Sequence, residues 1–248
     1  MKKNTFVDTG PYINDSFAIR HLYFPVNILH AMRYNQEWHS DLMVILFLIV
    51  TTPLAALLSA WLFTSPTTWV LILGGLLTIT SIVLFVLLIM SIKKMGKPQT
   101  FFKRGVLNPG IICHVTEEYV GILVLAEITQ NKTAWGLISL QAKKLPGHNL
   151  RAGERVPVTC CFGPGVNDEA FGIGYALPIS WGTNDKSVIQ YGVDNIPEEE
   201  WKILDKVKQR YKDLDRDSYP LASSIPQRLE RLSDKEIIEL GLDTLYES

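Results

Sequence analysis

Residues 42–63 read LMVILFLIVTTPLAALLSAWLF, and residues 69–90 read WVLILGGLLTITSIVLFVLLIM. Each run has 22 residues and no charged side chain. As a helix, each run would be roughly 33 Å long, enough to cross a hydrocarbon core of about 30 Å. We therefore expect a transmembrane hairpin over residues 41–91, closed by the short uncharged loop 64–68.

A signal peptide or the core of a soluble protein would fit these two runs less well. A signal peptide would begin near the N-terminus, and it would not be followed at once by a second apolar run. Two buried helices of a soluble protein would be unusual in a chain of 248 residues. The whole sequence is 47% apolar and 20% charged, and its apolar excess is concentrated in the two runs. This pattern excludes a secreted disulfide scaffold, a coiled coil and a transporter with many spans.

Basic residues on one side of the hairpin predict its orientation. A basic membrane collar follows the second run within the linker region 92–104, whereas the loop between the runs is uncharged. Because positive charge favours the cytoplasmic side, we expect a multi-pass protein of the cell membrane with both termini in the cytoplasm. The lipid bilayer is then its first partner. The collar residues are Lys93, Lys94, Lys97, Lys103 and Arg104.

The two spans also contain helix-bending and small residues. Pro53 removes a hydrogen bond within the first span, and we expect the hydroxyl of Thr51 or Ser59 to help satisfy the freed carbonyl. Gly74 and Gly75 would let the two helices approach closely, or would serve contact with a second copy, so a homo-oligomer is possible. Neither span contains an ionisable side chain, which favours an anchor over an ion path.

Residues 1–40 are expected to form a cytoplasmic N-terminal segment. Apolar residues recur at helical spacing between Val26 and Trp38. This spacing predicts a helix that lies either in the membrane interface or against the cytosolic domain, and the pattern does not distinguish the two.

The sequence predicts a small β domain over residues 105–181, which begins with a turn-rich stretch at 105–110. Five short segments rich in branched and aromatic residues are separated by turn formers, with a tight hairpin expected at 130–132. They predict a small antiparallel barrel, closed or half-closed, or a sandwich. The segments are 111–115, 121–129, 133–140, 155–162 and 171–177.

Proline and glycine residues indicate where two of these strands lie in the sheet and what can approach them. Pro157 cannot donate a ladder hydrogen bond, which predicts an edge strand or an unpaired nitrogen. Gly172 and Gly174 leave one face of the last strand without side chains, so a packed helix, a tight bend or a ligand could approach it. With the nearby Trp181 they form the candidate interaction or ligand surface.

Residues 182–248 are expected to be helical and to pack on the β domain. Thr183, Asn184 and Asp185 offer N-caps for a short helix, and acidic residues after Pro197 open a longer one. From Pro226 the sequence predicts one or two short amphipathic helices. Ser233 and Glu236 have the spacing of a capping box, and Gly241 offers a stop.

The fold class expected from these patterns is an α+β membrane protein. A two-helix transmembrane hairpin is followed by the small antiparallel β domain and by C-terminal helices.

Charge and cysteine content narrow the possible chemistry. Residues 1–104 hold 9 basic and 4 acidic residues, which leaves 15 basic and 21 acidic residues in 105–248. An acidic distal part argues against nucleic acid as a partner. Cys160 and Cys161 are adjacent and, with Cys113, fit reduced thiols in a cytosolic domain; a reactive thiol pair is the alternative. We find no catalytic motif, no metal-ligand spacing and no cofactor fingerprint, and we expect no cofactor.

Short motifs resemble a known family. The run 104–110, RGVLNPG, is followed by Trp181-Gly182-Thr183 and then by Glu200-Trp201. This pattern is similar to an uncharacterised bacterial family of membrane proteins, domain of unknown function 3239, over roughly residues 100–215. The resemblance implies a location in the bacterial inner membrane and supplies no activity and no functional residues.

The sequence thus predicts a membrane-anchored cytosolic β domain of unknown activity. We expect a non-enzymatic interaction or accessory module with a protein partner, although the sequence leaves an enzyme open. One alternative is an immunity or envelope-stress protein that acts through its hairpin. Another is a thiol-dependent enzyme that uses Cys160 and Cys161.

Overall fold

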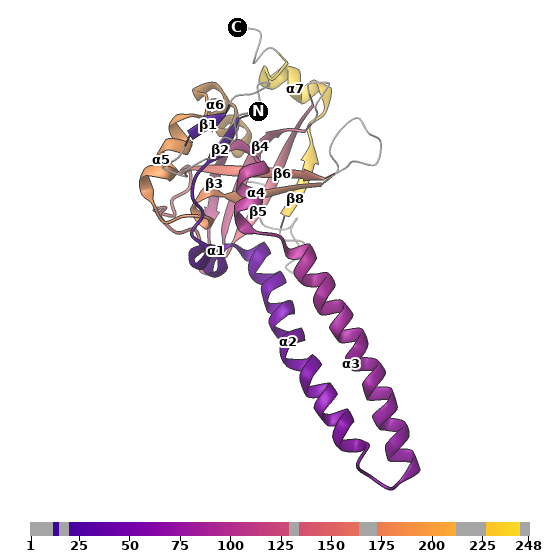
Figure 1. Ribbon diagram of the computed structural model, residues 1–248. Helices are drawn as coiled ribbons and strands as arrows, with labels where there is room; N and C mark the ends of the chain where they lie inside the picture. Colours follow the sequence, from indigo (N-terminus) through magenta and orange to yellow (C-terminus); the bar gives the residue numbers. More distant parts are fainter. Residues whose placement is uncertain (1–11, 15–19, 129–133, 164–172, 212–226, 244–248) are drawn as a thin grey trace, which may run out of the picture. The chain divides into compact units, whose positions relative to one another are not determined.

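The computed structural model describes residues 12–14, 20–128, 134–163, 173–211 and 227–243 (Figure 1). Contacts divide the chain into two units. One unit comprises residues 36–97, and the other comprises residues 1–35 and 98–248. We call the first unit the hairpin and the second the β domain.

The hairpin consists of α2 (Gln36–Leu62) and α3 (Thr68–Met95), which confirms the two predicted helices. Polar side chains join them. The hydroxyl of Ser59 donates to the Gly74 carbonyl at 2.8 Å and lies 2.6 Å from the hydroxyl of Thr78. About two turns further along, the Ser81 hydroxyl donates to the Thr52 carbonyl at 3.3 Å. Side-chain hydrogen bonds between helices stabilise a helix pair in apolar surroundings, where the backbone hydrogen bonds lie within each helix.

Two expectations for the hairpin need correction. The Thr51 hydroxyl bonds the Phe47 carbonyl at 2.9 Å, and Ser59 bonds α3, so neither serves the carbonyl freed by Pro53. A Cβ added at Gly74 would lie 3.4 Å from the Cβ of Leu62, whereas one at Gly75 would have no atom within 4 Å. Gly74 therefore lies at contact distance from α2, whereas Gly75 does not, and contact of Gly75 with a second copy stays a prediction.

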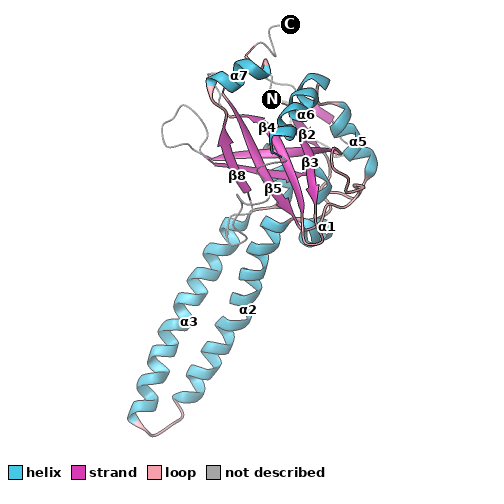
Figure 2. Cartoon of the chain, turned by 180° about the vertical axis from the view of Figure 1, so that it is seen from behind, coloured by secondary structure: helices cyan, strands magenta, loops and turns pink. Residues whose placement is uncertain are grey.

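The β domain is built on one six-stranded antiparallel sheet in the order β7-β6-β3-β4-β5-β8. The sheet is strongly curved (Figure 2). Its two edge strands, β7 and β8, contact each other, and no ladder between them is described. The half-closed barrel is thus correct, and the closed barrel and the sandwich are wrong for the described residues. The strands are β3 (Val106–Val115), β4 (Val120–Glu127), β5 (Trp135–Ala142), β6 (Arg155–Gly163), β7 (Ile173–Pro178) and β8 (Gln227–Arg231).

Five of the six strands lie where the sequence predicts them, but β3 begins five residues earlier. Residues 106–110, part of the stretch 105–110 that the sequence predicts as a turn, form the first half of this strand and pair with β6. A larger residue would not fit at position 110, because an added Cβ would lie 2.8 Å from Val158 Cγ2 and 2.9 Å from the Val156 carbonyl oxygen. This glycine permits close packing of β3 against β6. The sequence alone predicted a turn here, because glycine is also a common turn residue.

Pro157 lies in an internal strand, because β6 has a partner on each side. The edge-strand interpretation is therefore wrong. Pro157 is the Cα partner of Pro109 in β3, and the pairing of β6 with β7 starts only at Val158. Its missing N–H thus falls just outside the β6–β7 ladder, as the second interpretation required. The predicted hairpin turn at 130–132 lies outside the described residues.

Short strands and helices complete the β domain. In the N-terminal region, β1 (Tyr12–Asn14) pairs with β2 (His21–Tyr23), and α1 (Ile28–Tyr34) follows. Directly after the hairpin comes α4 (Pro98–Arg104), in a stretch that was expected to be a linker. Helix was expected instead of β8 after Pro226, and this expectation is wrong for residues 227–231.

The C-terminal helices agree with the capping signals in the sequence. The helix α5 (Lys186–Asp194) begins after Asp185, whose side chain accepts a hydrogen bond from the Ser187 N–H. After α6 (Glu198–Tyr211) and β8, α7 (Asp234–Leu240) has the full capping box of Ser233 and Glu236 and ends at Gly241 in the left-handed conformation. These helices add Trp201, Leu204, Ile237 and Leu240 to the core of the half-barrel.

Candidate functional site

The hairpin exposes an unusually apolar surface. Its candidate spans are Trp38–Leu62 and Thr68–Lys93, with mean hydropathies of 2.5 and 2.7. Only 28% and 11% of their most apolar windows are buried within the structure. A core helix of a soluble protein would be mostly buried, so these helices present apolar side chains outward along their length. Large exposed examples include Phe47, Leu57, Leu76, Ile79 and Phe85.

The segment 20–27 packs on the β domain and adds two residues to its core. Leu22 and Phe24 are each only 1% exposed. The Leu107 N–H at the start of β3 donates to the Arg20 carbonyl at 2.6 Å, and the ring nitrogen Nδ1 of His21 lies 2.9 Å from the Gly105 carbonyl. The chain before the hairpin therefore folds onto the chain that follows it, although the two are far apart in sequence.

A buried ion pair fixes the same segment to α6. Arg20 Nη2 lies 2.6 Å from Glu200 Oε2, and the two side chains are 16% and 2% exposed. The second oxygen of Glu200 has no hydrogen-bond partner within the described structure. Burial raises the pKa of Glu127, at the end of β4, above its ordinary value, and the negative charge of Glu200 raises it further. Two carboxyl groups and one guanidinium group thus share this region of the β domain.

Two aromatic rings and one amide side chain join α4 to the strand-like segment before α1. The rings of Phe24 and Phe102 meet edge to face at 5.3 Å between centroids. Gln99 Oε1 accepts the Val26 N–H at 2.8 Å, and Gln99 Nε2 donates to the Phe24 carbonyl at 2.9 Å. The side chain of Gln99 therefore substitutes for a neighbouring strand and holds α4 beside the start of α1.

The helix α1 is attached to the β domain along one side. Just before it, the Asn27 N–H donates to the Gly182 carbonyl at 2.9 Å. Within it, His30 Nε2 lies 2.9 Å from the Ser180 carbonyl, and Ala31 is fully buried. Of the two placements that the sequence left open, contact with the domain is therefore present in the structure. Contact with a membrane by the opposite side of α1 stays a prediction.

The three residues of the predicted ligand surface occupy different environments. Gly172 lies outside the described residues, and Gly174 pairs with Phe162 in the β6–β7 ladder. Trp181 is fully buried, and its indole N–H donates to the Lys144 carbonyl at 2.9 Å. Ala176, which shares a face of β7 with Gly174, is also fully buried. The environments of Trp181 and Ala176 indicate packing, and a ligand at Gly172 and Gly174 stays a prediction.

The predicted basic collar is divided between two helices. Lys93 and Lys94 lie in the last turn of α3, and Lys97 lies between α3 and α4. Lys103 and Arg104 form the exposed last turn of α4, where the helix dipole favours positive charge.

The adjacent cysteines are poor candidates for thiolate chemistry. Cys160 is fully buried in β6, and burial strongly raises the pKa of its thiol. Burial also raises the pKa of Cys161 to about 11, and its thiol donates to the Phe101 carbonyl at 3.4 Å. A nucleophilic cysteine needs a lowered pKa, so both thiols are predominantly protonated at neutral pH.

Sequence reasoning missed the contacts that hold the N-terminal segment to the β domain. Arg20 and Glu200 are 180 positions apart, and no local pattern connects them. Glu200 has the position of an ordinary helix-dipole acid in the first turn of α6. The one available signal was the apolar alternation of Leu22, Phe24 and Val26, which is typical of a strand-like segment packed on a core.

A comparison with known families agrees with the resemblance in the sequence. The family model described as "Protein of unknown function (DUF3239)" matches residues 93–212. A solved structure, "Crystal structure of a putative membrane protein from Corynebacterium diphtheriae", is 23% identical, with a TM-score of 0.41, and the match covers 46% of this chain and 95% of that one. No curated protein matches the sequence. The resemblance of the region after the second span to the DUF3239 family is confirmed.

Proposed function

We propose that this chain is an integral membrane protein whose hairpin anchors the β domain at the cytoplasmic surface. The observation that carries the proposal is the exposed apolar surface of the hairpin. Two helices long enough to cross a bilayer are only 28% and 11% buried over their most apolar windows. Hydrocarbon is the solvent that makes such a surface favourable, and helices are one of the two structures that satisfy their backbone there.

Charge supports the orientation. The loop between α2 and α3 has no charge, whereas the end of α3 and the chain just beyond it carry the basic collar. The positive-inside tendency then keeps the loop outside and the β domain in the cytoplasm.

The β domain itself we propose to be a non-enzymatic module that holds a protein partner at the membrane. The helix α7 supports this role. Ile237 and Leu240 fix α7 to the core, while Ile238 between them is 66% exposed. A helix that is packed on the core and presents an isoleucine to solvent is a suitable contact for a partner's apolar groove or helix. The raised pKa values of Cys160 and Cys161 argue against the alternative of a thiol-dependent enzyme.

Two measurements test this proposal. Washing membranes with alkaline carbonate should leave the full-length chain in the pellet, and its release into the supernatant would exclude the anchor. A photoreactive amino acid at Ile238 should form a specific adduct in cells, whereas the same group at Leu150, 40% exposed in a loop, serves as the matched control. Equal adduct patterns at both positions would exclude α7 as the contact.

A further inference from the structure

Two neighbouring apolar residues of α1 are exposed although the helix is firmly attached. Ile28 is 59% exposed and Leu29 is 79% exposed, which makes Leu29 the most exposed large apolar residue of the described chain. The helix cannot simply turn to bury them, because His30 and Ala31 hold its other side against the domain. The attached helix therefore leaves two adjacent apolar side chains in solvent, and apolar surface flanked by polar residues is typical of interaction sites.

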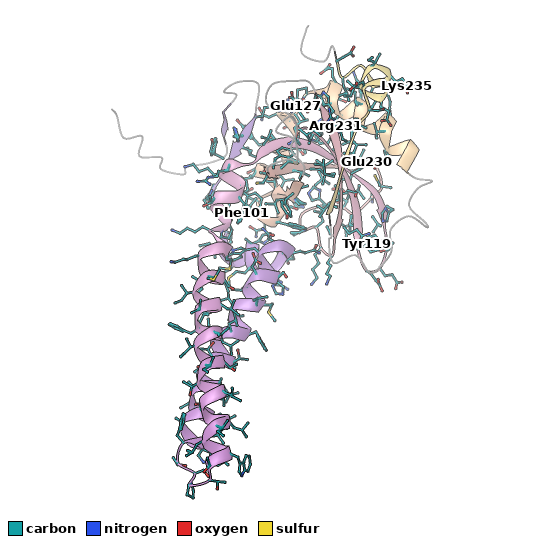
Figure 3. The ribbon with its side chains drawn as sticks, turned by 90° about the vertical axis from the view of Figure 1, so that its right-hand side faces the viewer. Phe101, Tyr119, Glu127, Glu230, Arg231 and Lys235 are labelled. Carbon is teal, nitrogen blue, oxygen red and sulfur yellow. The ribbon has the colours of Figure 1, made fainter. Side chains whose placement is uncertain are left out.

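The neighbouring helix α4 has the same division of faces. Pro98 and Phe102 are buried in the domain, whereas Phe101 is 37% exposed, and Figure 3 shows it on the surface of α4. Exposed Lys103 and Arg104 follow directly. The bonds of Gln99 to Phe24 and Val26 hold this helix beside the start of α1. Both helices are therefore attached to the same β domain, and each leaves apolar or basic side chains exposed.

Chain connectivity brings both helices close to the ends of the spans. Only Asn35 separates α1 from α2, and only two residues separate α3 from α4. Leu29 is nine residues before Trp38, where the first candidate span begins. If the hairpin spans a bilayer, as proposed above, α1 and α4 both lie within a few residues of its surface.

Resting on that proposed function, we propose that α1 and α4 form a docking surface of the β domain for anionic phospholipids. Ile28 and Leu29 enter the interfacial layer, and Arg33, Lys103 and Arg104 bind lipid phosphate. Apolar side chains flanked by basic ones are the chemistry of membrane-surface helices. Because residues 105–248 hold 21 acidic and 15 basic residues, an anionic surface repels most of the domain and attracts these helices. The hairpin supplies the anchor, and this surface fixes the orientation of the domain.

The test uses the full chain in nanodiscs that contain phosphatidylglycerol. Spin labels are placed at Leu29→Cys, at Ile238→Cys and at Leu57→Cys, and collisions with oxygen and with a water-soluble nickel chelate are compared. Cys113→Ala and Cys161→Ser remove the accessible native thiols, and fully buried Cys160 remains. Ile238 is the matched control, because α7 and α1 lie at opposite ends of the β domain (Figures 1 and 2).

We expect the label at position 29 to favour oxygen, as the label at 57 does, while the label at 238 favours nickel. Replacing Arg33, Lys103 and Arg104 by glutamate should reduce the population in which the label at position 29 lies in lipid, by about fivefold or more for each residue replaced. Nanodiscs of phosphatidylcholine alone should also reduce this population. Circular dichroism verifies that the reversed variant is folded. No change on charge reversal would overturn the phosphate contacts.

The remaining outcomes separate this inference from the anchor itself. Nickel accessibility at 29 equal to that at 238, with position 57 in lipid, overturns the docking surface and leaves the anchor intact. Shielding of position 29 from both reagents identifies a protein contact, such as a second copy, and also overturns it. Nickel accessibility at position 57 overturns the anchor and the docking surface together.

Discussion

Arg20 Nη2 and Glu200 Oε2 lie 2.6 Å apart and connect the segment before the hairpin with the helix α6. Both side chains are largely removed from water, and the chain between them includes the whole hairpin. The ion pair therefore has a topological role, since it joins the parts of the β domain that precede and follow the inserted hairpin. Breaking one partner of a buried pair leaves the other charge without compensation.

The variant Arg20→Ala should lower the free energy of unfolding of the β domain by about 3 kcal/mol, because Glu200 would stay buried and unpaired. For a domain of this size the loss corresponds to a decrease in Tm of roughly 6–12 °C. Circular dichroism of the full chain in nanodiscs measures it. The double variant Arg20→Met, Glu200→Leu should recover most of the loss, and an unchanged Tm in the single variant would disprove the role of the pair.

Gly110→Ala tests the packing of β3 against β6. The new methyl group would meet Val158 Cγ2 at 2.8 Å and the Val156 carbonyl oxygen at 2.9 Å, so the strands must separate. Overpacking of this kind costs about 1–3 kcal/mol. The matched control is Gly75→Ala in α3, where the methyl group meets nothing within 4 Å. Equal thermal stability of the two variants would show that β3 and β6 have room at Gly110.

The carboxyl group of Glu127 should make stability depend on pH. Burial and the charge of Glu200 raise its pKa above the ordinary 4.5, so the folded state binds this proton more tightly than the unfolded state. The stability that it contributes is complete below pH 4.5 and is lost as the pH rises through the raised value.

Glu127→Gln should therefore raise Tm at pH 7 and have little effect at pH 4, where the native carboxyl group is already protonated. Thermal unfolding between pH 4 and pH 8 measures the difference. Glu118→Gln, at an exposed residue, is the control and should show no such trend. A lower Tm at pH 7 for Glu127→Gln would contradict the sign of the effect.

Cys161 should react slowly with thiol reagents. Its pKa is raised from an ordinary 9.0 to about 11, which reduces the thiolate fraction at pH 8 about a hundredfold. Mass spectrometry after timed treatment with iodoacetamide should show alkylation at least that much slower than that of free glutathione. Alkylation as fast as that of glutathione would restore the thiol-dependent enzyme as a candidate.

The parts of the fold that could be predicted are those that local patterns determine. Apolar runs predicted α2 and α3, and turn formers between branched residues predicted five strands. The capping box of Ser233 and Glu236 predicted α7. Each of these signals depends on residues that are close in sequence, and so it can be read without tertiary contacts.

The remaining features depend on contacts between distant residues. The strand β8 is a charged five-residue segment, QRLER, and it is a strand because β5 supplies its hydrogen bonds. Gly110 looks like a turn residue until Val156 and Val158 are placed beside it. The sequence shows that Ile28 and Leu29 are apolar, but it does not show that they are exposed. Only the attachment of α1 through His30 and Ala31 shows which side of the helix remains uncovered.

The central claim is that the hairpin crosses a membrane and leaves the β domain in the cytoplasm. Single cysteines at Ser65→Cys in the loop and Ile238→Cys in α7 test it directly when intact bacterial cells that express the chain are treated with a membrane-impermeant maleimide. The account predicts labelling at position 65 in intact cells and at position 238 only after the membrane is permeabilised. Labelling of position 238 in intact cells, or protection of position 65 while 238 reacts, would contradict it.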